Sequence, residues 1–334
     1  MPDASISSAP FPPRPWWVWL NVLGLDAVVA ALSWMLLFGK ATGAHLVRAE
    51  YTVLGCAVWC LYALDRLMDG TMTGGLRGER HLFAARFRFL LIAGILMAGG
   101  IAVWLLAYEV REIVVRWGLK LLLAAGFYFV VTLLSRRAWV GLAGAGGLAG
   151  LLAIGLMQGA ASGVLWAQVW RGLFAGFLIT VVVFFSLRQA GGVAPWVLPR
   201  KFLGGFLFSV GAALASYAHL ERWPYLILDS QVILFGLVCG LNSLGIRLWE
   251  TEHADIEHRL LERLYPWMLT SAAGGAAMEY SAGDQWTRPL FIACGAAALF
   301  LLALHLTRDR TTVAVRRALA DAAIIVSALA VLWM

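Results

Sequence analysis

The chain has 334 residues, of which 61% are hydrophobic and only 13% are charged, and its mean hydropathy is +0.80. An average soluble domain is about 25% charged, so this composition excludes a soluble fold and predicts an all-α integral membrane protein with many spans. The net charge of +7 is explained by Lys and Arg retained in cytoplasmic loops. We therefore expect the lipid bilayer, and no nucleic acid, as a partner.

The expected elements begin after a Ser- and Pro-rich stretch at residues 1–14, which lacks the basic region and cleavage site of a signal peptide and is predicted to be a disordered cytoplasmic tail. Residues 15–334 are expected to form a single polytopic transmembrane domain. A span needs about 20 mostly apolar residues. Such segments lie near 16–38, 48–69, 87–108, 113–134, 138–160, 167–187, 202–219, 226–249, 265–282, 289–306 and 316–334.

The distribution of basic residues predicts the orientation of these spans. With the N-terminus inside and the spans alternating, most of the 26 Lys and Arg residues fall at inner ends and inner loops. This follows the positive-inside rule and predicts a multi-pass protein of the cytoplasmic (inner) membrane with its C-terminus outside. The longest polar loops, 70–86 and 251–263, lie on the inner side as well. An inward-facing site is favoured.

A first acidic stretch ends the second expected span, with Asp65 and Asp69 in the run Leu61–Asp69. Residues four apart share one face of a helix, with Cβ atoms about 6 Å apart. Carboxylates are unfavourable at a membrane boundary, so a pair of them suggests a site. Mg²⁺ is held by one or two carboxylates together with phosphate oxygens, and these two aspartates suit it. The alternative is an interfacial anchor in which Asp65 pairs with a nearby Arg.

A second acidic stretch ends the span near 226–249 and contains Glu250, Glu252 and Asp255. Under the predicted topology both spans run from outside to inside. The two stretches therefore reach the same face and could converge on one divalent cation. A solvated helix face is the open alternative, because the spacings of these acids do not form one stripe.

The first stretch resembles a motif of the UbiA superfamily of intramembrane prenyltransferases. That family carries Asn-Asp-x-x-Asp-x-x-x-Asp at the cytoplasmic end of its second span. Asp65 and Asp69 match the last two aspartates, whereas Leu61 and Tyr62 stand where the Asn and the first Asp belong. The missing pair removes a carboxylate that the family uses on Mg²⁺.

The second stretch lies where the family has a further aspartate-rich motif, typically Asp-x-x-x-Asp, at the end of the sixth of nine spans. Glu250, Glu252 and Asp255 occupy that region without its spacing, and Asn242 lies upstream on the same span. Arg200-Lys201 is similar to the basic residues at the family's fourth-to-fifth span junction. Three spans follow the second stretch, as in the family. The layout thus resembles a UbiA-like bundle with about nine core spans plus two extra ones.

The resemblance implies a Mg²⁺-dependent prenyltransferase that moves an isoprenyl group from a prenyl diphosphate to a hydrophobic acceptor, either aromatic or lipid. On this basis the expected catalytic residues are Asp65, Asp69, Glu250 and Asp255, the metal ligands Asp65, Asp69, Glu250, Glu252 and Asp255, and the substrate-binding residues Asn242, Arg66, Arg247, Lys201 and Tyr62.

Other interpretations remain open. A membrane transporter or lipid-binding protein would use the same charges for gating or head-group contact, with Asp26 and Lys120 inside expected spans. A catalytically inactive UbiA relative is favoured by the missing Asn-Asp pair. A hydrogen bond to a neighbouring helix explains Asp26 equally well, as does pairing with Arg116 or Lys120.

Overall fold

The computed structural model describes residues 16–72, 83, 86–134, 197–220, 226, 229–250 and 256–334. All regular elements in this part of the chain are helices, as predicted. The expected tail 1–14 and the expected spans 138–160 and 167–187 lie outside it. The helices are α1 (Trp16–Leu23), α2 (Leu25–Thr42), α3 (Arg48–Met72), α5 (Arg88–Tyr108), α6 (Glu112–Leu134), α9 (Val197–His219), α10 (Ser230–Glu250), α11 (Ile256–Ala282), α12 (Arg288–Leu306), the 3₁₀ turn η3 (Arg308–Arg310) and α13 (Val313–Leu332).

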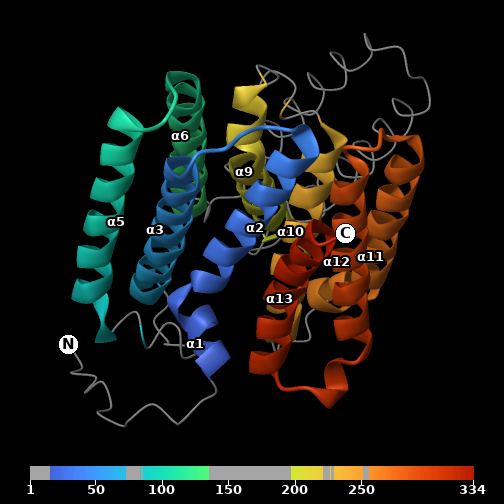
Figure 1. The fold of residues 1–334 in the computed structure, drawn as a ribbon. Coiled ribbons are helices and arrows are strands. Elements are labelled where there is room, and N and C mark those ends of the chain that lie inside the picture. Colours follow the sequence, from blue (N-terminus) through green and yellow to red (C-terminus); the bar gives the residue numbers. More distant parts are fainter. Residues whose placement is uncertain are drawn as a thin grey trace, which may run out of the picture.

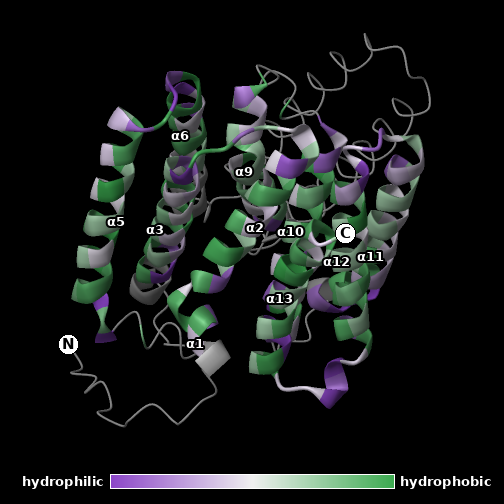
Figure 2. Ribbon diagram, viewed as in Figure 1, coloured by the Kyte–Doolittle hydropathy of each residue, from purple (hydrophilic) through white to green (hydrophobic). Residues whose placement is uncertain are grey.

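Five of the described helices are long and apolar enough to cross a membrane, which supports an integral membrane protein. They are Leu25–Thr42, Arg88–Tyr108, Lys201–His219, Ser230–Glu250 and Arg288–Leu306. Figure 2 shows hydrophobic residues along the helices, with hydrophilic ones gathered near several of their ends, most clearly around η3.

The helices stand side by side in one bundle, with α10 in its interior and α5 at its edge (Figure 1). In the most apolar stretch of α10, 72% of the residues are buried, and the neighbours of this helix include α9, α11, α12 and α13. In the most apolar stretch of α5, which packs on α3, only 6% of the residues are buried. An apolar helix with so little protein cover is what a lipid-facing position at the rim requires.

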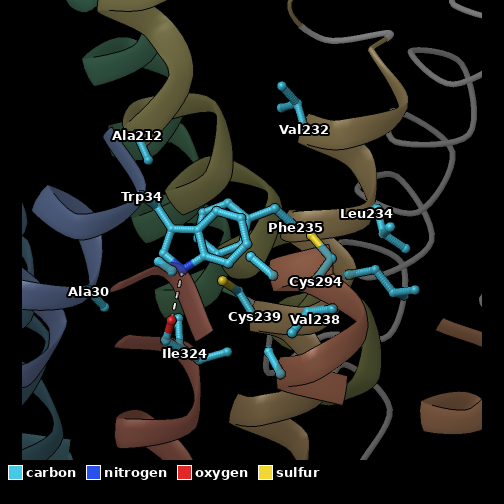
Figure 3. Close-up of a cluster of buried hydrophobic side chains, with 14 of the residues drawn as sticks. Ala30, Trp34, Ala212, Val232, Leu234, Phe235, Val238, Cys239, Cys294 and Ile324 are labelled. Atoms are coloured by element: carbon cyan, nitrogen blue, oxygen red, sulfur yellow. Dashed lines mark hydrogen bonds between the residues drawn. The ribbon is translucent and has the colours of Figure 1, made fainter. Parts of the chain in front are cut away.

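Aromatic side chains hold α2 against α10 and α13. The Trp34 ring stacks on Phe235 with centroids 3.7 Å apart, and its Nε1 donates to the Ile324 carbonyl at 3.0 Å (Figure 3). All the polar capacity of this buried indole is thereby satisfied. The contact fixes the first span between the two helices that supply the polar residues described below.

Small residues let α9 and α10 approach closely. A Cβ added to Gly205 would lie 2.5 Å from both the Gly236 carbonyl oxygen and the Gly240 nitrogen. Gly236 and Gly240 are one turn apart on α10, the spacing that allows close helix crossings in membranes. Ser209 Oγ donates to the Val232 carbonyl at 2.6 Å beside this crossing.

Helices α3 and α10 run in the same direction. His219, the last residue of α9, lies 2.7 Å from Glu50 in the first turn of α3, and α10 starts near that end after α9 (Figure 1). Both α3 and α10 therefore end at the opposite side of the bundle, hereafter the α3/α10 end. The common direction agrees with the one expected from the sequence.

Candidate functional site

The first span is broken at Gly24. This residue lies between α1 and α2 with φ of 71°, the left-handed conformation that glycine adopts without a Cβ penalty. Because α1 ends here, backbone carbonyls in its last turn lack the N–H donors that a continuous helix would provide. In a bilayer such groups require donors from elsewhere in the protein.

Helix α3 supplies those donors. The buried Arg66 guanidinium donates to the Val22 carbonyl and, at 2.6 Å, to the Asn21 carbonyl. Trp59 Nε1 donates to the Leu23 carbonyl at 3.1 Å. Arg66, which the sequence predicted to contact substrate, therefore stabilises the break in the first span by hydrogen bonding to its carbonyls. Its contact with a phosphate stays a prediction.

A group of amides and carboxylates lies next to the break. The group consists of Asn21 in α1, Asp26 in α2, Asn242 in α10 and Asp321 in α13, and we call it the inner polar cluster. Asn21 Nδ2 donates to Asp26 Oδ2 at 2.6 Å and to Asp321 Oδ2 at 2.8 Å. Asn242 Nδ2 donates to Asp321 Oδ1 at 2.9 Å. Four helices are thus tied together near the α3/α10 end.

The first acidic stretch adjoins this cluster. Tyr62 on α3 is close enough to Asp26, Asp65 and Asp321 to interact with each electrostatically. The residue as a whole is 41% exposed. Asp65 is half-buried one turn further along α3. The α3 stretch and the inner polar cluster are therefore neighbours.

The second acidic stretch reaches the same region through α13. Glu250, at the end of α10, forms an ion pair with Arg317. Arg317 in turn interacts electrostatically with Asp321, one turn further along α13. The first and second stretches are therefore connected through the α1–α2 break and through α13.

The described residues do not by themselves form a divalent metal site. Among them, no group of three or more His, Cys, Asp or Glu side chains is arranged to hold a metal ion. The Asp69 side chain, Glu252 and Asp255 lie outside the described part. The Mg²⁺ site expected from these three residues together with Asp65 and Glu250 therefore stays a prediction.

The other expected substrate contacts are placed as follows. Lys201 is half-buried near the start of α9, and Arg247 is exposed near the end of α10, so both lie towards the α3/α10 end. Asn242 is buried and bonded to Asp321. Their roles towards a substrate stay predictions.

Asp26, expected in the middle of the first span, lies in the first turn of α2 and accepts from Asn21, which belongs to the same expected span but to a separate helix, α1. The contacts of the two basic residues considered for it are local to α6. Arg116 pairs with Glu112 at 2.6 Å, and Lys120 Nζ lies 3.7 Å from the Trp117 ring centroid.

Sequence reasoning did not single out Asn21 or Asp321. Asp321 could have been found from the sequence, because it is a carboxylate inside the apolar segment near 316–334. An ionisable residue inside a span is a candidate functional residue, which is also why Asp26 was considered. Comparisons with protein-family models, with curated proteins and with solved structures find no match to this chain. The chemistry of the site alone therefore carries the functional conclusion.

Proposed function

We propose that this protein is a UbiA-like intramembrane prenyltransferase that transfers an isoprenyl group from a prenyl diphosphate to an aromatic or lipid acceptor. The observation that supports it best is the connection of the α3 and α10 acidic stretches at one end of an apolar bundle. A prenyl diphosphate has a highly charged head and a long apolar tail. Polar, charged residues at one end of an apolar bundle match both parts.

In this proposal the diphosphate head binds at the α3/α10 end, which faces the cytoplasm. Lys201 and Arg247 contact phosphate oxygens, Arg in a bidentate manner. Mg²⁺, when bound, neutralises the charge that develops on the leaving diphosphate. Its ligands are proposed to be Asp65, Asp69, Glu250, Glu252 and Asp255. The apolar tail extends along the hydrophobic helices, and Tyr62, which is exposed beside Asp65, contacts the substrate.

The test is Mg²⁺-dependent binding of a long-chain isoprenyl diphosphate to the purified, full-length protein. We expect the double change Asp65→Asn/Asp69→Asn to weaken binding at least about tenfold, because it removes two ligands of the metal. Asp309→Asn is the matched control, since Asp309 in η3 is a highly exposed acid at the same end. Binding that ignores Mg²⁺, or that survives the double change in a folded protein, contradicts the proposal.

A transporter is the second candidate, and the broken first span favours it. Transporters commonly place discontinuous helices and an intramembrane acid at their substrate or ion site, and Asp26 lies directly after the break at Gly24. In that case Asp26→Asn stops substrate flux into liposomes and leaves diphosphate binding intact. A catalytically inactive relative would bind the diphosphate and transfer nothing to any acceptor.

A further inference from the structure

We propose that the inner polar cluster binds a monovalent cation, with Na⁺ as the ion that fits it best. The site would consist of oxygens from Asp26, Asn242 and Asp321, held in place by Asn21. It adjoins the prenyl-diphosphate site proposed above, but its Asp26 and Asp321 are not among the acids that site uses at the ends of α3 and α10.

An unsatisfied oxygen points to a ligand. Asn242 is 9% exposed, and its Nδ2 is committed to Asp321 Oδ1 at 2.9 Å. Its Oδ1 is fully buried, and no described residue donates to it. A buried acceptor left without a donor destabilises the fold. A cation beside the cluster would coordinate this oxygen directly.

The charges of the cluster are also compatible with a bound cation. Asp26 and Asp321 are bridged by the single amide nitrogen of Asn21, and they interact electrostatically. Two ionised carboxylates this close in an apolar interior repel each other, and either a proton on one of them or a positive charge near them relieves the repulsion. Of the nearby guanidinium groups, that of Arg66 donates to backbone carbonyls, and that of Arg317 pairs with Glu250 and also interacts electrostatically with Asp321.

The donors favour Na⁺ over the other cations. All three are oxygens, which hard cations prefer. Ca²⁺ takes about 6–8 oxygens, and Mg²⁺ dehydrates reluctantly and usually keeps several waters, whereas this cluster offers two carboxylates and one amide in the interior of the bundle. Broken membrane helices recur at Na⁺ sites, and the break at Gly24 adjoins Asp26. A proton shared by the two carboxyl groups would leave Asn242 Oδ1 unsatisfied.

The experiment measures thermal unfolding of the purified protein in detergent, followed by tryptophan fluorescence, in NaCl or in choline chloride at equal ionic strength. We expect NaCl to raise the Tm saturably by several degrees, because an ion that binds only the folded state stabilises it. Asp321→Asn and the nearly isosteric Asn242→Leu should each abolish the increase. The matched control Asp309→Asn should retain it.

Each alternative occupant gives a different result. If Asp321→Asn does not fold, two independent measurements remain. They are the Tm of Asn242→Leu and the saturable binding of radioactive sodium to the unmodified protein. The absence of any NaCl-specific Tm increase, together with no sodium binding, overturns the proposal in favour of a buried water. Stabilisation by MgCl₂ but not by NaCl overturns it in favour of a divalent site. A Tm that depends on pH through Asp321 but never on Na⁺ overturns it in favour of a shared proton.

Discussion

At the scale of single residues, Arg66 shows how one side chain can stabilise a backbone irregularity inside a membrane. Its guanidinium is planar and carries several donors, so one group reaches the carbonyls of both Asn21 and Val22. We expect Arg66→Met to lower the Tm, because it removes the donor to the Val22 carbonyl, which costs about 1–3 kcal/mol. The Asn21 carbonyl keeps its bond from the Gly24 N–H at 3.2 Å. Arg66→Lys should restore part of the lost Tm, since an ammonium keeps the charge but lacks the planar, multi-donor geometry of the guanidinium.

The matched control for this prediction is Arg259→Met, which removes an exposed guanidinium near the start of α11. Its Tm should stay close to that of the unmodified protein. If Arg66 served only to bind phosphate, Arg66→Met would leave the Tm unchanged and weaken diphosphate binding. Measuring Tm and binding on the same variants therefore separates the two roles.

At the scale of elements, the crossing of α9 and α10 depends on glycine. Because a Cβ on Gly205 would lie 2.5 Å from backbone atoms of α10, Gly205→Ala forces the two helices apart. We expect a loss of roughly 1–3 kcal/mol, the range for overpacking a close contact, read as a lower Tm. Gly118→Ala in α6 is the control, since a Cβ there meets nothing within 4 Å. It should be neutral or slightly stabilising, because Ala favours the helix. Equal effects of the two changes would contradict the packing argument.

The elements that the sequence predicts well are those decided by local hydrophobicity. Apart from the first, which is divided into α1 and α2, each expected span within the described residues corresponds to one helix, because an apolar run of sufficient length can be recognised without knowing its partners. The break at Gly24 is different: it depends on donors from Arg66 and Trp59, which come from another helix. Asn21 and Asp321 are 300 positions apart in the sequence, so no local sequence pattern predicts their contact. The acidic stretches could be located in the sequence, but the polar residues that connect them could not.

At the scale of the whole molecule, the orientation in the membrane decides which compartment the candidate site faces. Arg308, Arg310, Arg316 and Arg317 lie at the start of α13 and in η3, at the α3/α10 end. The positive-inside rule therefore predicts that this end is cytoplasmic. The connection between α5 and α6, which contains Glu109, lies at the opposite end of the bundle (Figure 1).

Two single-cysteine variants test this orientation, each made in a chain whose 4 native cysteines are replaced by alanine. We expect Asp309→Cys to react with an impermeant maleimide only from the cytoplasmic side and Glu109→Cys only from the outside, because both positions are exposed at opposite ends. The reversed pattern would place the acidic stretches outside, where a cytoplasmic prenyl diphosphate could not reach them. Labelling of both from one side would mean that α5 and α13 do not span the membrane in the directions described. Orientation is therefore a requirement for the proposed enzyme, whereas Na⁺ binding at the inner polar cluster is compatible with either result.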